Sequence, residues 1–132
     1  MKLIYKCTCI IACLAIMSCH KDKNTGDSAI KQLTSTDSGS TATVSMGQTI
    51  SLTLGNPGDG GYQFNDPKYN SSVLTLVSHK ENVGVHAGMI GDFGKDIWTF
   101  TAKGSGTTTL EVTAHRGNTE IISMFSNQIV VK

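Results

Sequence analysis

The sequence predicts an all-β fold, an immunoglobulin-like β-sandwich of about seven short strands. Short runs of residues alternate polar and apolar side chains, which is the pattern of half-buried strands. Threonine and valine, which favour strands, are frequent in these runs, and glycine-rich turns separate them at short spacing. No long window has the period of an amphipathic helix. These observations together indicate a sandwich built without helices.

Length and charge limit the architecture and the partners. The chain has 132 residues, 39% of them hydrophobic and 16% charged, which suits one globular domain with a core. Its formal net charge of +1 includes Lys2 and Lys6, which lie in a segment expected to be removed; 11 − 2 = 9 basic residues then face 10 acidic ones, leaving about −1. Nucleic acid is therefore not an expected partner, because phosphate binding needs a clustered basic face.

Residues 1–18 are predicted to be a lipoprotein signal peptide. Lys2 and Lys6 precede an apolar run at residues 9–17 that is too short to span a bilayer comfortably. Residues 16–19, Ile-Met-Ser-Cys, resemble a bacterial lipobox, and the polar residues directly after Cys19 favour lipidation over an ordinary secretory signal. The resemblance implies that Cys19 carries the lipid and that the protein is anchored to a membrane of the bacterial cell envelope, periplasmic or surface-facing.

Cysteine usage excludes several kinds of chemistry. All four cysteines lie in the first 19 residues, so the folded part has no thiol for a disulfide, a metal or a nucleophilic attack. The spacing of Cys7, Cys9 and Cys13 lacks the paired geometry of zinc ligands. We therefore expect no metal and no cofactor.

Residues 19–41 are predicted to be a lipidated, flexible tether. They are mostly Lys, Asp, Asn, Thr, Gly and Ser, a composition that buries too little apolar surface to offset the entropy of ordering. Ala29, Ile30 and Leu33 are the exceptions and could form a short strand or a helical turn. The tether would hold the domain, residues 42–132, away from the membrane surface.

The strands of the domain follow in order from Ala42. Residues 42–46 and 49–54 alternate in polarity on either side of a turn, and residues 62–64 resume the alternation after a glycine-rich connection. The later predicted strands are residues 73–77, 97–102, 107–114 and 121–132, the last with a bulge or a division at residues 126–128. Residues 104–106, Gly-Ser-Gly, are predicted to form a tight hairpin connection. The expected core includes Trp98, Phe100, Leu110 and Val112.

The connection at residues 56–62, Asn-Pro-Gly-Asp-Gly-Gly-Tyr, contains more glycine than a turn requires. Pro57 fixes one backbone φ, whereas the three glycines permit positive φ and remove side chains that would hold a partner away. The loop is therefore predicted to make close backbone contact with a partner.

Candidate catalytic groups are few. The histidines, His20, His79, His86 and His115, have neither metal-ligand spacing nor a neighbouring nucleophile. Residues 92–94, Asp-Phe-Gly, have the letters of a kinase metal-binding triplet without the motifs that give it meaning. Asp59 and Asp66 are too few carboxylates for a calcium loop. The chain is therefore not expected to be an enzyme.

Three loops in matching order resemble those of the chagasin family, the inhibitors of papain-like cysteine peptidases. Residues 56–62 resemble the family's Asn-Pro-Thr-Thr-Gly-aromatic loop, and residues 88–94 with residues 97–102 look like its second glycine-rich loop and the following strand. Residues 104–110 are similar to its Ala-Gly-Thr hairpin, and Arg116 occupies the place of the arginine in its Arg-Pro-aromatic loop. The resemblance extends over residues 42–132.

The resemblance implies a monomeric immunoglobulin-like inhibitor whose three loops form a wedge that fills the peptidase cleft. It gives Asn56 the role of stabilising the first turn and Pro57 that of stiffening it, and it places Tyr62 at the loop base in the core. Phe93 and Arg116 would contact the two walls of the cleft. The implied peptidase-binding residues are Asn56, Pro57, Gly58, Asp59, Gly60, Gly61, Tyr62, Gly91, Asp92, Phe93, Gly94, Arg116, Gly117 and Asn118.

The sequence departs from the family pattern in each loop. The first loop has Gly58-Asp59 in place of two threonines and one more glycine before its aromatic residue, and other residues interrupt the glycines of the second. Gly117-Asn118 stand where the third loop of the family has proline and an aromatic residue. The alternative function is a non-inhibitory binding module that recognises a surface protein or a glycan; Phe93, Tyr69 and Tyr62 are its aromatic candidates.

Overall fold

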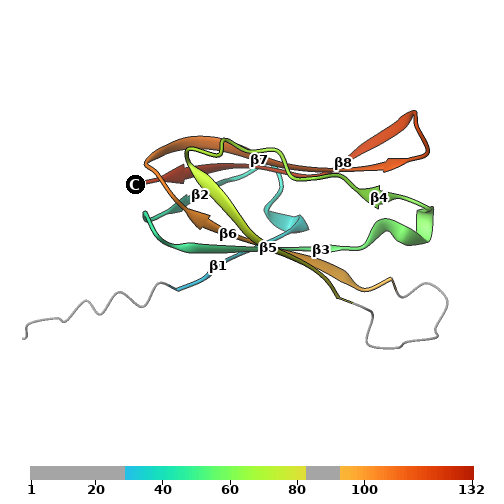
Figure 1. The fold of residues 1–132 in the computed structure, drawn as a ribbon, viewed down its shortest axis with the longest axis horizontal. Helices are drawn as coiled ribbons and strands as arrows, with labels where there is room; N and C mark the ends of the chain where they lie inside the picture. The colour runs from blue at the N-terminus through green and yellow to red at the C-terminus, as the bar shows by residue number, and fades with distance from the viewer. Residues whose placement is uncertain (1–28, 83–92) are drawn as a thin grey trace, which may run out of the picture.

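The computed structural model describes residues 29–82 and 93–132, which form two packed four-stranded β-sheets (Figure 1). The all-β sandwich predicted from the sequence is confirmed. In spatial order, sheet A contains β1 (Lys31–Thr34), β3 (Thr49–Gly55), β6 (Lys95–Ala102) and β5 (Leu74–Asn82). Sheet B contains β2 (Thr41–Val44), β8 (Glu120–Val131), β7 (Gly106–Arg116) and β4 (Gln63–Phe64). Two short 3-10 helices, η1 (Ser35–Asp37) and η2 (Pro57–Gly60), complete these ranges.

The expected signal peptide and Cys19 lie outside the described residues. Within the ranges that are described, no helix is long and apolar enough to cross a membrane.

The first strand overturns part of the predicted tether. β1 pairs in parallel with β3, and η1 then carries the chain across to β2 in the other sheet. Leu33 is only 1% exposed and belongs to the hydrophobic core. The sandwich therefore begins at β1 and not at Ala42. Of the two alternatives left open for Leu33, the short strand is the one observed. The polar composition of residues 29–41 hid its place in the domain, because one buried leucine and the backbone hydrogen bonds of an existing sheet are enough to hold a short edge strand.

The core lies between the two sheets and is filled by alternate residues of their strands. The four predicted core residues, Trp98, Phe100, Leu110 and Val112, are all at most 1% exposed. Phe64 meets Trp98 edge-to-face with ring centroids 4.8 Å apart. This aromatic pair closes the end of the core beneath the glycine-rich loop, and so it supports that loop from inside.

The turn at residues 103–105 is not the predicted hairpin connection. β6 belongs to sheet A and β7 to sheet B, so the turn carries the chain between sheets. Gly104 packs so closely on the neighbouring connection that a Cβ there would lie 2.6 Å from the carbonyl oxygen of Ser72. A Gly-Ser-Gly sequence is compatible with any tight turn. Whether the turn joins two strands of one sheet or crosses between sheets depends on strand pairing, which the local sequence does not encode.

The predicted irregularity in the last strand lies earlier than expected. β8 is continuous, and its register with β7 shifts between Val112 and Thr113, which leaves Met124 as the extra residue. The polar residues at 126–128 resemble a break because they include Asn127, which is nevertheless buried. Its side-chain nitrogen donates hydrogen bonds to the Asp37 carbonyl and the Ser40 hydroxyl, at 2.7 and 2.9 Å.

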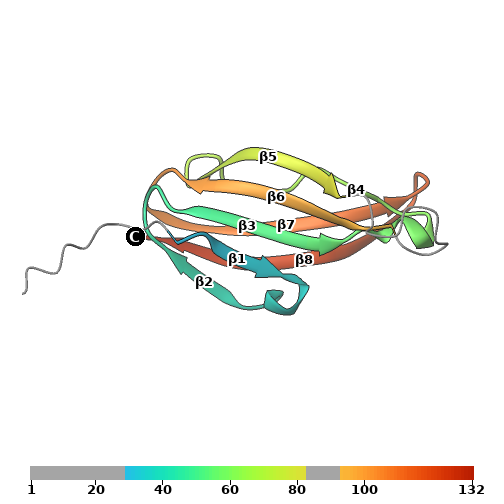
Figure 2. The same ribbon diagram turned by 90° about the horizontal axis from the view of Figure 1, so that it is seen from below.

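The two ends of the sandwich carry different connections (Figure 2). At one end β3 leads into the glycine-rich loop, β6 begins, and β7 turns into β8; we call this the loop end. The opposite end holds the entry to β1, the turn at residues 45–48, the turn at residues 103–105 and Lys132; we call it the distal end. The chain therefore enters the domain at the end opposite its loops.

Candidate functional site

Three connections meet at the loop end. Loop 1 (residues 56–62) follows β3, the described part of loop 2 (residues 93–94) precedes β6, and loop 3 (residues 116–119) joins β7 to β8. Gly55 pairs with Lys95, so loop 1 starts beside the end of loop 2. Gly91 and Asp92, which were also predicted to contribute, lie outside the described residues.

Loop 1 is an ordered turn. The side-chain oxygen of Asn56 accepts a hydrogen bond of 2.9 Å from the backbone N–H of Gly58, and Pro57 occupies the first position of η2. Both are favourable at the start of a helical turn, where free N–H groups need a partner and a fixed φ costs nothing. Gly61 ends the turn in the left-handed conformation with φ 73°. Asn56 therefore stabilises the turn through its side chain.

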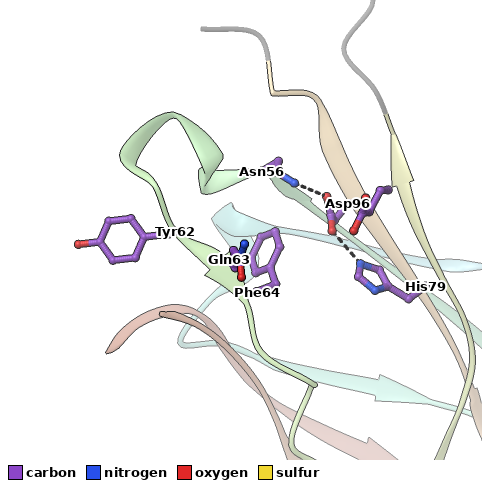
Figure 3. A pocket seen from close by; sticks show the side chains of 7 residues that line it. Asn56, Tyr62, Gln63, Phe64, His79 and Asp96 are labelled. Atoms are coloured by element: carbon purple, nitrogen blue, oxygen red, sulfur yellow. Dashed lines mark hydrogen bonds and ion pairs between the residues drawn. The ribbon is translucent and has the colours of Figure 1, made fainter. Parts of the chain in front are cut away.

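A buried carboxylate connects loop 1 to both strands that flank loop 2. Asp96 on β6 is 2% exposed; its Oδ1 accepts a hydrogen bond of 2.9 Å from the Asn56 side chain, and its Oδ2 lies 2.7 Å from Nε2 of His79 on β5 (Figure 3). The His79 ring stacks on Trp98 with centroids 4.5 Å apart. Burying a carboxylate is costly unless its oxygens have partners, and here both have one. The network therefore fixes the base of loop 1.

Sequence reasoning gave Asp96 no role and treated His79 as a histidine without a chemical partner. A signal was nevertheless present in the alternation of β6. Asp96 shares the inward-facing parity of Trp98 and Phe100, so an acidic side chain there must be buried and must find donors. The identity of those donors depends on strand pairing.

A pocket of about 360 Å³ lies beside this network. The described residues that line it are Asn56, Tyr62, Gln63, Phe64, His79, Glu81 and Asp96, which include no serine, cysteine or lysine. His79 and Asp96 are already bonded to each other, and the ranges 29–82 and 93–132 contain no group of three side chains suited to a metal ion. The pocket therefore has the acid and histidine of a catalytic arrangement without a nucleophile.

Loop 2 packs on loop 1. A Cβ on Gly58 would lie 2.8 Å from Cδ1 of Phe93, and the backbone N–H of Asn56 donates a hydrogen bond of 3.0 Å to the carbonyl of Gly94. Phe93 remains 47% exposed, so part of its ring is free to meet a partner. Glycine at position 58 thus allows the two loops to lie against each other.

Loop 3 is joined to loop 1 by a cluster of three side chains. Nε and Nη2 of Arg116 donate hydrogen bonds of 2.9 and 2.6 Å to Oε2 of Glu120, while the Tyr62 hydroxyl donates to Oε1 of the same carboxylate. The Arg116 guanidinium lies 5.0 Å from the centroid of the Tyr62 ring, and its Nη1 is 3.5 Å from the Gly60 carbonyl oxygen. Loop 1 is therefore in contact with both loop 2 and loop 3.

The position of Tyr62 corrects an expectation. Tyr62 does not anchor the loop in the core. Figure 3 shows its side chain pointing away from Asp96 and His79, and its ring lies against the Arg116 guanidinium. Phe64 is the aromatic residue that reaches the core, on Trp98. Tyr62 has the same strand parity, but it precedes the first residue of β4, where the sandwich has already ended.

The cluster changes the acidity of its members. The hydrogen bond from the Tyr62 hydroxyl, followed by those from Arg116, lowers the pKa of Glu120. The hydrogen bond to Glu120 raises the pKa of Tyr62 and that of Arg116. Each shift favours the state in which Glu120 is charged and its two partners are protonated, so the cluster is intact at neutral pH. Beyond it, Gly117 with φ 59° and Asn118 form the exposed tip of loop 3.

The chain and its fold were compared with known protein families and solved structures. The family described as "Chagasin family peptidase inhibitor I42" matches residues 43–124. The crystal structure of the cysteine protease inhibitor EhICP2 from Entamoeba histolytica is similar with a TM-score of 0.61 and 16% identity, covering 78% of this chain and 95% of that chain. The solution structure of Amebosin is similar with a TM-score of 0.60 and 18% identity, covering 78% and 97%.

These two identities are low, and the structural likeness shows a shared fold. None of the curated proteins matches the chain significantly. The family match covers more than half of the chain, and it includes the strands that carry the loop end. The chain belongs to the chagasin family of peptidase inhibitors.

Proposed function

We propose that this protein inhibits papain-like cysteine peptidases by inserting loops 1, 2 and 3 into the active-site cleft. The observation that carries the proposal is the contact of loop 1 with both other loops, from Gly58 to Phe93 and from Gly60 to Arg116. The protein is an inhibitor and not an enzyme, as members of its family are. Inhibition is therefore occlusion of the cleft, with no bond made or broken by this chain.

The glycines of loop 1 suit a narrow cleft. Gly58, Gly60 and Gly61 add no side chains to the tip of the loop, so at these three positions its backbone can approach the catalytic cysteine of a target closely. Pro57 and the Asn56 side chain hold the turn before binding. Because little conformational entropy is then lost on docking, an interface of about 1,600 Å² is sufficient for tight binding.

All the residues predicted from the sequence remain in the proposed binding site, as contacts or as supports. Residues 57–61 form the tip that enters the cleft, Phe93 with Gly91, Asp92 and Gly94 meets one wall, and Arg116 with Gly117 and Asn118 meets the other. Asn56 and Tyr62 support the loops from within, through Asp96 and through Glu120. The absence of an aromatic residue after Arg116 leaves Phe93 as the aromatic anchor of the wedge.

The experiment is a titration of papain and of a cathepsin L-type peptidase with the purified full chain, read with a small peptide substrate. Occlusion predicts competitive inhibition that saturates at one inhibitor per enzyme. No inhibition of any papain-like enzyme at micromolar concentration would overturn the proposal. As a control, peptidase whose cleft is already blocked should not be captured by immobilised inhibitor; capture of that form would instead favour a binding module that uses another surface.

The lipid anchor at Cys19 is a separate part of the proposal. The lipobox resemblance of residues 16–19 supports it, and it places the inhibitor at a membrane of the bacterial cell envelope. Residues 20–28 would then connect the lipid to the domain. In a bacterial host, the Cys19→Ala variant should lose incorporation of labelled fatty acid and leave the membrane fraction. A parent chain that takes up no fatty acid would refute the anchor and leave the proposed inhibition unaffected.

A further inference from the structure

The distal end carries a surface patch that inhibition does not use. Two apolar side chains are exposed there, Ile30 at 53% and Met46 at 60%. Lys31 begins β1, and Lys103 and Lys132 are exposed at the same end. We call these five residues the distal patch.

Backbone and side-chain hydrogen bonds hold the patch together around the turn at residues 45–48. The N–H of Met46 donates to the carbonyl of Lys132 at 2.9 Å, and that of Gly47 donates to the carbonyl of Ala102, next to Lys103, at 2.8 Å. The side chain of Gln48 donates to the carbonyl of Ala29 at 2.7 Å. The five residues are therefore brought together from four segments that the fold fixes side by side.

The charged side chains of the patch are all positive. In the described ranges the acidic residues lie elsewhere: Asp59, Glu81, Asp96 and Glu120 are at or near the loop end, and Asp37, Asp66 and Glu111 lie along the middle of the sandwich. Within residues 29–82 and 93–132, neither Lys31, Lys103 nor Lys132 forms an ion pair. Three lysine side chains without an ion pair among the described residues thus surround two exposed apolar side chains.

We propose that the distal patch docks on an anionic membrane surface, so that the three loops face away from the bilayer. Lysines beside isolated apolar side chains suit the headgroup region, where ammonium groups meet phosphates and short apolar groups reach the acyl boundary. The proposal concerns the opposite end from the loops and does not depend on inhibition.

The length of chain before the patch agrees with a membrane as the partner. Residues 20–28 separate Cys19 from the first described residue, Ala29, and a chain of that length spans at most about 35 Å. A lipid on Cys19 would hold the distal patch at high effective concentration next to the bilayer, so that even weak docking is populated. Figure 1 places the loops at the far end of the molecule from this entry point.

The test is the chemical accessibility of lysines in the full chain mixed with an excess of lipid vesicles. A water-soluble acetylating reagent is applied with vesicles of equal phosphatidylglycerol and phosphatidylcholine, and with pure phosphatidylcholine, and each lysine is quantified by mass spectrometry. Docking predicts that phosphatidylglycerol slows acetylation of Lys31, Lys103 and Lys132 by about five-fold. This factor corresponds to the attraction of a single lysine to an anionic membrane surface. Lys68, Lys80 and Lys95, which are exposed elsewhere on the domain, serve as internal controls and should not change.

A pair of variants separates docking from general attraction. The Lys31→Glu/Lys103→Glu variant should lose the protection of Lys132, whereas the Lys68→Glu/Lys80→Glu variant, with the same change in charge, should keep it. Lys68, Lys80 and Lys103 are exposed and Lys31 is half-buried, and none of the four belongs to the hydrophobic core, so both variants should fold and inhibit a peptidase in solution like the parent. Equal acetylation of distal and control lysines with phosphatidylglycerol, or protection that survives in both variants, would overturn the proposal.

Discussion

The side-chain amide of Asn56 donates a hydrogen bond of 2.9 Å to the buried carboxylate of Asp96, which joins loop 1 to the strand that follows loop 2. The same carboxylate meets His79 at 2.7 Å, on the strand that precedes loop 2. One buried side chain therefore sets the distance between two of the three loops. An inhibitory wedge needs loops that are fixed relative to each other before binding, because loops that move independently lose more conformational entropy when they bind.

The first prediction concerns Asp96. The Asp96→Ala variant leaves the Asn56 amide and the His79 ring without their partner, which should cost about 1–3 kcal/mol of folding free energy. Inhibition should weaken more than this loss explains, because loop 1 is no longer fixed. Urea unfolding and an inhibition titration check the two effects. Lys95→Ala, at the exposed neighbouring position, is the control; an Asp96→Ala protein as potent as the parent would show that the network does not hold the wedge.

The second prediction concerns the tip of loop 1. A Cβ on Gly60 would lie 3.0 Å from the Tyr62 ring, and Gly61 has φ 73°, which a β-branched residue rarely adopts. Replacing both with valine should abolish inhibition while the circular dichroism of the sandwich is kept. The matched control is Gly55→Val, since a Cβ at Gly55 meets nothing within 4 Å. If the double variant inhibits as well as the control, loop 1 is not the wedge.

The third prediction is a coupling between loops 1 and 2. A Cβ on Gly58 lies 2.8 Å from Phe93, so Gly58→Ala should displace the ring and weaken inhibition by about ten-fold, as a loss of about 1.4 kcal/mol would. In the Phe93→Ala background the same substitution should have little further effect. A double-mutant cycle of inhibition constants measures this. Strictly additive losses would argue that the two loops act separately.

The fourth prediction is a dependence on pH. The folded pKa of Glu120 is lowered, so its carboxylate stabilises the folded state above the unfolded pKa, and this contribution is lost as pH falls through the folded pKa. Thermal melts of the parent and Glu120→Gln should therefore differ at neutral pH and converge in acid. A difference in Tm that is the same at every pH would mean that the carboxylate charge is not what binds Tyr62 and Arg116.

The fifth prediction follows from the corrected start of the domain. Leu33 is 1% exposed, so Leu33→Ala should destabilise the fold by about 2–5 kcal/mol, and a chain that starts at Ala42 should melt at a clearly lower temperature. The exposed neighbour Gln32, changed to alanine, is the control. An unchanged melting temperature of the shortened chain would show that residues 31–41 belong to the tether and do not stabilise the domain.

The sequence was informative where structure is local. Alternation in residues 49–54 and 97–102 predicted β3 and β6 closely, and the inward parity of Trp98 and Phe100 predicted their burial. The family resemblance gave Asn56 and Pro57 the role of holding loop 1 in a turn, and the structure shows Asn56 bonded to Gly58 with Pro57 at the first position of η2.

The sequence was less informative where structure depends on pairing. The sequence left a short strand at Leu33 open, but the pairing of β1 with β3 that holds it is not encoded in residues 31–34. The turn at residues 103–105 crosses between sheets although its letters suit a hairpin. The partners of Asp96 and of Tyr62 come from other strands, so the support of the loops became visible only when the strands were in register.

Amide hydrogen exchange of the inhibitor, free and bound to papain, tests the central claim most directly. If the three loops enter the cleft together, exchange should slow in residues 58–61, 93–94 and 116–118 at once, while residues 45–48 and 103–105 at the distal end stay unchanged. Protection of only one loop, or protection confined to the distal end, would contradict the wedge.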